Sequence, residues 1–171
     1  MDLSENNIGN AAETSGLLAQ VTSFITSADM HYELEAEKGL VYLRMCLDSG
    51  TYSAMLSVDD EEGLRRITTF STLPIKAPAQ SRMTTLEAIN HINYALAVGN
   101  FEMDMSDGEI RLRTGFSLAD AAMTEEMFNT LLSNTFSILD AYVPKLMRVV
   151  FGGSKPEDVL LSETPDSETV Q

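Results

Sequence analysis

Three polar side chains interrupt an apolar stretch with helical spacing, and amide or imidazole groups in such a place could bind a ligand or accept a proton. The stretch is AINHINYALAVGN, residues 88–100. At about 100° per residue, Asn93 falls inside the apolar arc, Asn90 lies at its edge and His91 lies opposite. Buried amides need hydrogen-bond partners, which adjoining backbone would supply. The pattern therefore favours a structural role for Asn93, assisted by Asn90, over a reactive site.

Two acidic stretches could hold a divalent cation, because such ions prefer oxygen ligands. The first, DMSDGE at residues 104–109, lacks the longer acidic spacing of a calcium-binding loop, and a hairpin turn explains it. The second, Asp59–Glu62, is typical of a solvated turn. His31 and His91 are the only histidines, and each is expected on a different helix. We therefore predict no metal site.

The single cysteine, Cys46, is a candidate nucleophile, but a nucleophilic thiol needs a base beside it. The strand pattern of residues 40–58 places Tyr42 and Arg44, and no histidine, on the same strand face as Cys46. The sequence also contains no GxSxG, phosphate-loop, GxGxxG or HExxH pattern. We predict no catalytic residues and no cofactor. A metal-dependent enzyme is therefore the third interpretation of function, behind two non-enzymatic ones.

The acidic charge of the chain excludes several classes of partner. The 171 residues have a formal net charge of −15 at pH 7. Because nucleic-acid binding depends largely on Lys and Arg, neither nucleic acids nor anionic membranes are expected partners. The start, MDLSENNIGN, does not resemble a secretory signal, and no apolar run reaches about 20 residues, the length of a membrane span. One cysteine cannot form an intramolecular disulfide, and we expect a cytoplasmic protein.

Apolar residues at helical spacing predict three helices. The first begins at Leu17, with residue 14 or 15 (Thr or Ser) as its N-cap. The second begins near Thr84 with a capping box. The third follows Thr124, and Pro144 is expected to kink or end it.

Alternating and β-branched segments predict the strands of an antiparallel sheet. They are residues 32–36, a hairpin at 40–58, residues 64–75 and a second hairpin at 101–113. An acidic turn at 59–63 is expected before the third segment, and Pro74 and Pro78 are expected to end it.

The hairpin at 40–58 has one apolar face if Ser49-Gly50 is its two-residue turn. The apolar pairs are then Leu47 with Tyr52, Met45 with Ala54, Leu43 with Leu56 and Val41 with Val58. A slip by one residue would exchange the faces, so the agreement of these pairs supports the hairpin. Tyr, Met and Arg are enriched at protein interfaces. We therefore predict that the other face binds protein through Tyr42, Arg44, Cys46 and Met55, with Phe70 from the next strand.

The hairpin at 101–113 is expected to turn at Asp107-Gly108. The same pairing places Met103 opposite Leu112 and Met105 opposite Ile110 on the inner face, and Asp104 opposite Arg111 and Glu102 opposite Arg113 on the outer face. Such exposed ion pairs contribute only about 0.2 to 1 kcal/mol each, so they select the register more than they stabilise the domain.

The order of these elements predicts an α+β domain, with an antiparallel sheet of about five or six strands and helices packed on one face. Residues 1–13 are expected to be a disordered segment, residues 14–151 a single domain and residues 152–171 an acidic flexible tail.

Residues 73–118 contain a combination of motifs that resembles the YbjN family, whose members are described as bacterial sensory transduction regulators. The motifs are an I-N-x-x-N-like helix, a Gly-x-Phe strand entry, an Asp-Gly turn and an Arg-bearing return strand, here Ile89, Asn90, Asn93, Gly99, Phe101, Asp107, Gly108, Arg111 and Arg113. The order of elements up to Phe151 also fits. The resemblance implies a type III secretion chaperone-like fold and a non-enzymatic protein that binds other proteins and often dimerises.

We therefore expect a non-enzymatic protein-binding module, chaperone-like or regulatory, that holds a segment of an unidentified protein on the mixed sheet face or at a sheet edge. The alternative is a homodimeric structural or adaptor protein that recruits partners through its acidic tail, with Val159, Leu160 and Leu161 as contacts.

Overall fold

Six strands and three α-helices, with three short 3-10 turns, make up the described part of the chain, residues 16–61, 64–119 and 121–161 of a computed structural model. In chain order they are α1 (Leu17–Ser27), β1 (Tyr32–Glu35), η1 (Ala36–Lys38), β2 (Leu40–Leu47), β3 (Gly50–Glu61), β4 (Leu64–Lys76), η2 (Ala79–Ser81), α2 (Arg82–Ala95), β5 (Asn100–Met103), β6 (Glu109–Ser117), α3 (Glu125–Gly152) and η3 (Pro156–Leu160).

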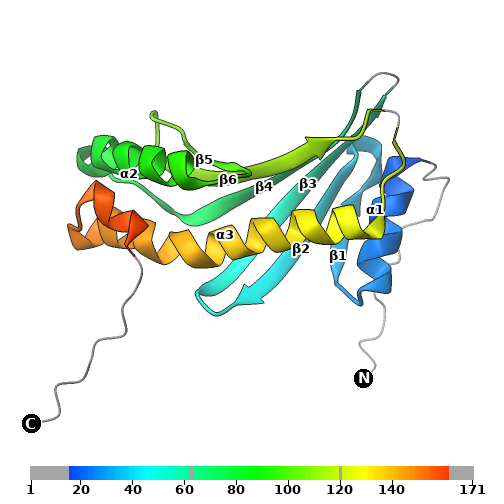
Figure 1. Ribbon diagram of the computed structural model, residues 1–171, viewed down its shortest axis with the longest axis horizontal. Helices are drawn as coiled ribbons and strands as arrows, with labels where there is room; N and C mark the ends of the chain where they lie inside the picture. Colours follow the sequence, from blue (N-terminus) through cyan, green and yellow to red (C-terminus); the bar gives the residue numbers. More distant parts are fainter. Residues whose placement is uncertain (1–15, 62–63, 120, 162–171) are drawn as a thin grey trace, which may run out of the picture.

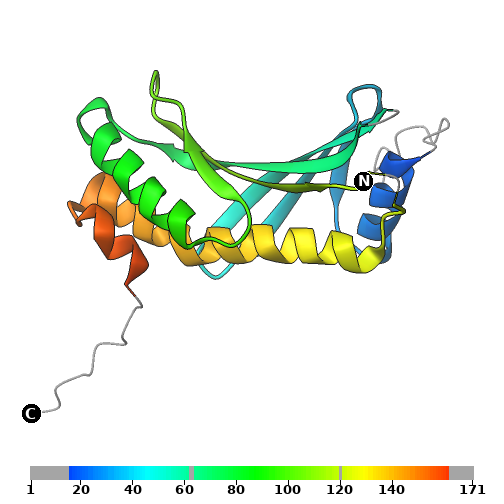
Figure 2. The same cartoon turned by 45° about the horizontal axis from the view of Figure 1, so that its top comes forward.

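All six strands belong to one antiparallel sheet, in the order β1-β2-β3-β4-β6-β5. The long helix α3 crosses one face of this sheet, α1 lies on the same side, and α2 lies beside β5 and packs on α3 and η3 (Figures 1 and 2). The predicted α+β fold, with helices on one face of an antiparallel sheet, is confirmed.

The core lies between the sheet and the helices because apolar and polar residues alternate along the central strands. Val41, Leu56, Ile67 and Leu112 point to the helices and are fully buried. The helices contribute the fully buried side chains Leu17, Val21, Ile25, Phe128, Leu139 and Leu146. Burying such a side chain contributes about 1.5 to 3 kcal/mol, so this one-sided burial determines where the helices lie.

The predicted hairpin of β2 and β3 is present, but its register differs from the prediction by two residues. Leu47 lies opposite Gly50, so Asp48 and Ser49 form the turn instead of Ser49 and Gly50. A shift by two leaves every side chain on its predicted face, and the apolar pattern cannot detect it. The turn is also held from outside the hairpin, since the Ser49 N–H donates to Asp140 Oδ1 of α3 at 2.8 Å.

The hairpin of β5 and β6 is shifted by two residues in the same way. The Asp104 N–H donates to the Glu109 carbonyl at 2.9 Å, so residues 105–108 form the loop. Gly108 has φ +81° and its carbonyl accepts the Ala77 N–H at 2.8 Å. A Cβ at position 108 would lie 2.1 Å from the Ala77 carbonyl oxygen. Contact with the segment before α2 therefore selects the longer loop over the predicted two-residue turn.

Strands β3 and β4 run further than predicted. β3 continues through the expected acidic turn to Glu61, where its residues pair with β4. β4 continues beyond Pro74 to Lys76. Its pairing with β6 is irregular between Thr72 and Lys76, so the missing N–H of Pro74 falls where no regular ladder is formed.

Helix α3 begins as predicted, because Thr124 Oγ1 accepts the Met127 N–H at 3.2 Å. It does not end at Pro144. A proline inside a helix costs about 3 kcal/mol. Val143 and Leu146, on either side of the proline, are almost fully buried, and each contributes about 1.5 to 3 kcal/mol. Burial of this part of α3 therefore outweighs the proline.

Helix α2 begins earlier than predicted, and Thr84 lies inside it instead of capping it. The guanidinium of Arg82 donates from Nη1 to the carbonyls of Met105 at 3.0 Å and Ser106 at 3.1 Å. These contacts tie the first turn of α2 to the loop between β5 and β6, which explains the earlier start.

A carboxylate of β3 holds the start of α1. Asp60 Oδ2 accepts the Leu17 N–H at 2.6 Å, and Asp60 Oδ1 accepts Arg65 Nε at 2.9 Å. Arg65 Nη1 donates in turn to the Ala121 carbonyl, before α3, at 3.0 Å. Gly16 has φ +90°, and a Cβ there would lie 2.1 Å from Asp60 Oδ2. The hydrogen bonds from Leu17 and then Arg65 hold the pKa of Asp60 below its ordinary value.

Asn93 joins α2 to the edge strand β5. Its Oδ1 accepts the Phe101 N–H at 2.8 Å, and its Nδ2 donates to the Phe101 carbonyl at 3.0 Å. The amide thus pairs with both backbone groups that Phe101 turns away from β6, as a neighbouring strand would. Asn90 is exposed, so it does not share the role expected for it.

The folded part extends beyond the boundary expected at residue 152. The segment η3 packs on α2, and Val159 is fully buried, which makes this segment part of the core instead of a flexible tail. Residues 162–171, the expected disordered segment 1–13 and the expected N-cap at 14–15 lie outside the described residues. Within the described ranges, none of the helices combines the length and apolar character needed to cross a bilayer.

Replacing Asp60 by Ala is expected to lower the free energy of unfolding by about 1 kcal/mol, the usual effect of removing a helix cap. Asp59→Ala is the matched control, because in the described part of the chain the Asp59 side chain forms only an exposed ion pair with Arg66. The native pKa of Asp60 lies below the ordinary 3.8, so its stabilisation is complete above that pH and is lost as the pH falls toward the native pKa. Urea unfolding of both variants at pH 7 and pH 3 checks this, and equal effects of the two substitutions at pH 7 would contradict it.

Asn93→Leu is expected to lower the free energy of unfolding by about 1 to 3 kcal/mol, because it leaves both backbone groups of Phe101 without their partner. Asn90→Leu makes the same change at an exposed position of the same helix and is expected to have little effect. Thermal unfolding measures both, and hydrogen exchange of the Phe101 amide is expected to accelerate only in Asn93→Leu. An unchanged melting temperature would refute the role assigned to this amide.

Candidate protein-binding surfaces

A row of apolar side chains crosses the sheet face opposite the helices. Tyr42 of β2 lies opposite Met55 of β3, and Met55 lies opposite Phe70 of β4. All three are half-buried, and no helix of the described part covers them (Figure 2). The structure therefore brings three residues of the predicted mixed face into one continuous row.

At one end of the row, the Tyr42 side chain is held by an ion pair of Glu35 and Lys38. The Tyr42 hydroxyl donates to Glu35 Oε1 at 3.0 Å, and Lys38 Nζ lies 2.5 Å from Glu35 Oε2. The hydrogen bonds from Lys38 and then Tyr42 lower the pKa of Glu35, while the bond to Glu35 raises the pKa of Tyr42. The phenol therefore stays protonated at neutral pH.

The other end is bordered by two arginines that share a carboxylate. Arg111 lies 4.9 Å from the centroid of the Phe70 ring, a cation–π contact. Glu102 accepts Arg111 Nη2 at 2.8 Å and Arg113 Nε at 2.8 Å. Burial raises the pKa of Glu102, but the hydrogen bonds from Arg111 and Asn100 and the charges of both arginines outweigh it and leave that pKa lowered.

The outward charge pairs of the second hairpin differ from the prediction because of its shifted register. Glu102 lies opposite Arg111 and reaches Arg113 diagonally. Asp104, expected opposite Arg111, instead accepts the Ser106 N–H at 2.8 Å within the loop.

The remaining predicted contacts, Arg44 and Cys46, are exposed on the same face. Cys46 Sγ lies 3.5 Å from Thr51 Oγ1. His31 is exposed beside β1 and His91 lies on α2, so the structure does not bring the two histidines together. Among the described residues, no three His, Cys, Asp or Glu side chains lie close enough together to hold a metal ion.

The expected contacts of the tail are separated by the fold. Leu160 and Leu161 are exposed, but Val159 is buried against the domain. A partner could therefore reach Val159 only after η3 detaches.

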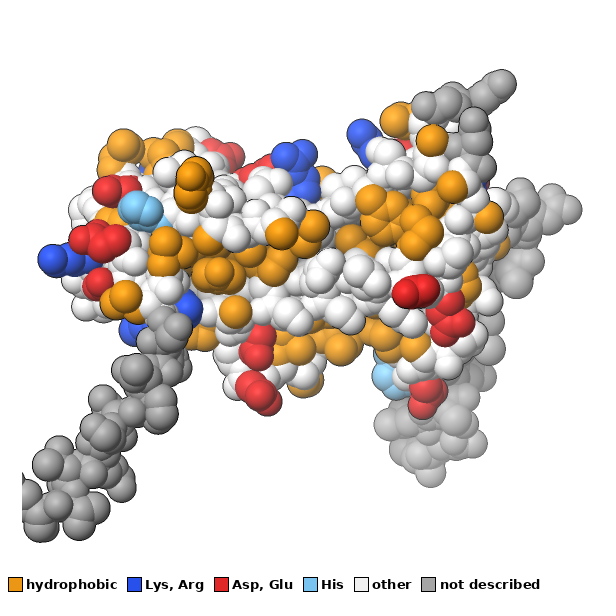
Figure 3. Space-filling model, in the orientation of Figure 1, with side chains coloured by type: hydrophobic (Ala, Val, Ile, Leu, Met, Phe, Trp, Pro, Cys, Tyr) orange, Lys and Arg blue, Asp and Glu red, His pale blue; other side chains and the backbone are white. Residues whose placement is uncertain are grey.

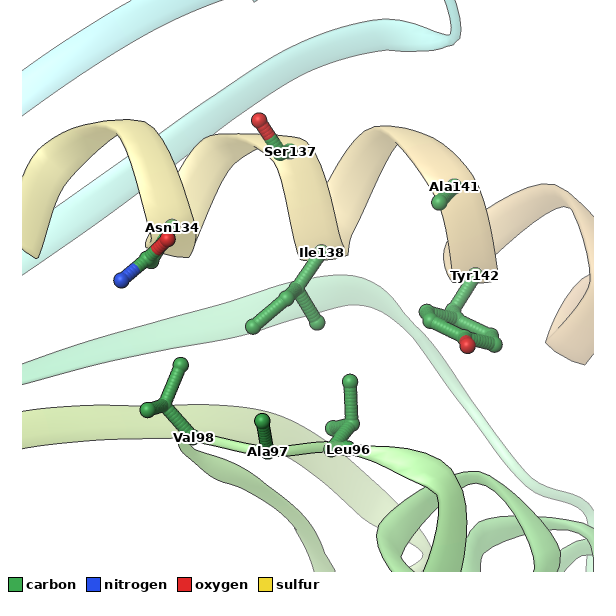
Figure 4. A pocket seen from close by; sticks show the side chains of 8 residues that line it. All are labelled: Leu96, Ala97, Val98, Asn134, Ser137, Ile138, Ala141 and Tyr142. Carbon is green, nitrogen blue, oxygen red and sulfur yellow. The ribbon is translucent and has the colours of Figure 1, made fainter. Parts of the chain in front are cut away.

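Two adjoining hollows lie along α3 on the helix side, and hydrophobic side chains gather above α3 in Figure 3. One, of about 250 Å³, lies between the segment after α2 and α3, where Leu96 and Val98 point toward Ile138 (Figure 4). The other, of about 370 Å³, lies between β6 and α3 and is called here the edge groove. Its apolar lining is Val98, Phe116, Met127 and Leu131.

Sequence reasoning missed both hollows because segments distant in the sequence build them, two for the smaller hollow and three for the edge groove. Residues 88–100 show helical spacing throughout, but α2 ends at Ala95 and Leu96 is extended. The one signal in the sequence is local, since Val98 is apolar and precedes a glycine. In the structure, half of the Val98 surface is exposed.

Comparisons with known proteins identify related sequences and folds. The model of the YbjN family, "Putative bacterial sensory transduction regulator", matches residues 17–148. No curated protein gives a significant match. A crystal structure of YbjN from E. coli, described as "a putative transcription regulator", is 13% identical, covers 81% of this chain and 92% of its own, and has a TM-score of 0.56. A crystal structure of the ExsC-ExsE complex contains a chain that is 14% identical, with 75% and 92% covered and a TM-score of 0.49.

Cys46 offers a direct test of the uncovered sheet face. Because the side chain is exposed and is the only thiol, a disulfide reagent such as DTNB is expected to release one equivalent of thiolate from the native protein. The Cys46→Ser variant is expected to release none. Reaction that begins only in denaturant would contradict the assigned exposure.

Proposed function

Since the chain belongs to the YbjN family, we propose that it is a non-enzymatic, chaperone-like or regulatory module that binds another protein on the uncovered face of its sheet. The observation that carries the proposal is the row of Tyr42, Met55 and Phe70 on a face that no helix of the described part covers.

The composition of this face suits protein binding. Tyr, Met and Arg are enriched at the centres of protein interfaces. The central row is apolar, and charged side chains border it at both ends. Each border is already paired, through Lys38 with Glu35 and through the two arginines with Glu102. A partner can therefore cover the row without leaving these charges unpaired.

The contacts proposed for the partner are Tyr42, Arg44, Cys46 and Met55, with Phe70 at the end of the row beside the arginines. The shared orientation supports this set, because all five side chains project from the same face of three neighbouring strands. A second copy of the chain could use the same row, and this homodimer is the other form of the proposal.

The test is quantitative affinity capture from an extract of the native host with a double variant, Tyr42→Ala with Met55→Ser. The matched control makes the same two substitutions at exposed positions elsewhere, Tyr94→Ala with Met147→Ser. We expect the control to retain a specific partner and the double variant to lose at least about nine-tenths of it, which corresponds to about 1.4 kcal/mol.

Equal thermal unfolding of the two double variants must accompany that result. Sedimentation at high protein concentration separates the two forms of the proposal, since a homodimer through this face would become monomeric only in the double variant. If both double variants capture every partner equally and sediment alike, the proposed surface is wrong.

A further inference from the structure

Strand β6 is longer than its outer neighbour, and this leaves a second sheet edge. β5 pairs only with Ile110–Arg113. β6 continues through Thr114–Ser117, which pairs with β4 on the other side. Because β5 begins at Asn100, the chain before it bends away and offers no ladder to this part of β6.

The backbone groups that face this edge can be assigned from the alternation of the ladder. The Glu109 carbonyl accepts the Asp104 N–H, so the backbone of Glu109 faces the β5 side. The backbone N–H and C=O groups of every second residue after it, up to Gly115 and Ser117, therefore face the same side. Leu118 donates to the Arg65 carbonyl on the β4 side, which agrees with the alternation. In the ranges that the structure describes, no turn, loop or side-chain hydrogen bond reaches the backbone of Gly115 or Ser117, and both residues are exposed.

The edge groove lies directly beside these groups. Side chains alternate between the faces of a strand, so a strand added to β6 would turn every second side chain toward α3. Phe116, Met127 and Leu131 form an apolar wall there, with Val98 half exposed at the rim. Figure 3 shows hydrophobic side chains along this side of α3. The groove can therefore receive an apolar side chain from a chain that pairs with β6.

The charge of the groove indicates which chain would fit. Glu126 is the one charged residue of its lining, and no ion pair among the described residues includes it. The arginines on the neighbouring strands are already paired, Arg66 with Asp59 and Arg113 with Glu102. A cationic side chain therefore complements this position.

We propose that an extended segment of a partner protein, with an apolar residue and a Lys or Arg two positions apart on the same strand face, adds to the sheet as a strand beside Thr114–Ser117. Its backbone pairs with Gly115 and Ser117, its apolar side chain enters the edge groove and its cation lies at Glu126. A second copy is disfavoured because both chains have a net charge of −15. The chain's own residues 1–15 contain three acids and no Lys or Arg, so they lack the required cation.

This inference rests on the proposed protein-binding role but concerns a different surface, and a peptide experiment separates the two. The probe is a short fluorescent peptide with the repeat Val-Thr-Lys-Thr, which places valine and lysine on the same face of an added strand, and its binding to the full chain is measured by anisotropy. Ser117→Pro removes the N–H that would face the added strand, whereas Ser117→Ala retains it. Proline is tolerated at such an edge position because that N–H has no ladder partner.

We expect Ser117→Pro to weaken peptide binding about tenfold or more, and Ser117→Ala to leave it unchanged. Glu126→Gln is expected to weaken binding and to reduce its salt dependence. The double variant at Tyr42 and Met55 is expected to bind the peptide normally. Loss of partner binding at the uncovered face is therefore distinguishable from loss of peptide binding at this edge.

Several outcomes would overturn the inference. Equal binding by Ser117→Pro and Ser117→Ala would indicate attraction to an acidic protein without strand addition, and no binding at millimolar peptide would refute the site. A dimer that Ser117→Pro dissociates would make the occupant a second copy, and tighter peptide binding after removal of residues 1–15 would make it the chain's own segment. If Ser117→Pro does not fold, a peptide with alternate N-methylated backbone amides must lose its binding to the unaltered protein.

Discussion

The sheet has one apolar face, and burial of that face under α1 and α3 is the constraint from which the rest of the structure follows. Val41, Leu56, Ile67 and Leu112 turn toward the helices and are fully buried. Since side chains alternate in a strand, the same burial turns Tyr42, Met55 and Phe70 outward. The uncovered row is thus a direct consequence of the way the core is formed.

The outer backbone groups of the sheet at β5 and at the end of β6 differ in their hydrogen-bond partners. At β5 the amide of Asn93 binds both backbone groups of Phe101 and replaces a neighbouring strand. Further along, β6 continues without β5, and the backbone of Gly115 and Ser117 receives no such partner in the described part of the chain. An edge of this kind is a template for another strand. Its position beside an apolar groove makes it suited to binding.

Charged side chains hold the helices at one end of the sheet, and the net charge of the surface determines which partners are attracted. Asp60 and Arg65 link the start of α1 to the segment before α3, so an ion pair at the end of the β3–β4 hairpin orients two helices. On the uncovered face, Arg111 and Arg113 are held by Glu102. The remaining excess of acids favours cationic partners and opposes self-association.

The sequence by itself determined which faces of the strands are buried, where the hairpins lie and where α3 begins, because period-two alternation and the Thr124 cap act between residues close in the chain. Only the tertiary structure decided the hairpin registers, the passage of α3 through Pro144 and the place of Val159 in the core. A shift by two residues preserves the buried face, so the pattern cannot resolve it. The deciding contacts, such as Asp140 with Ser49 and Ala77 with Gly108, join segments that are distant in the sequence. The edge groove arises in the same way, because α3, β6 and the segment after α2 must all be in place before it exists.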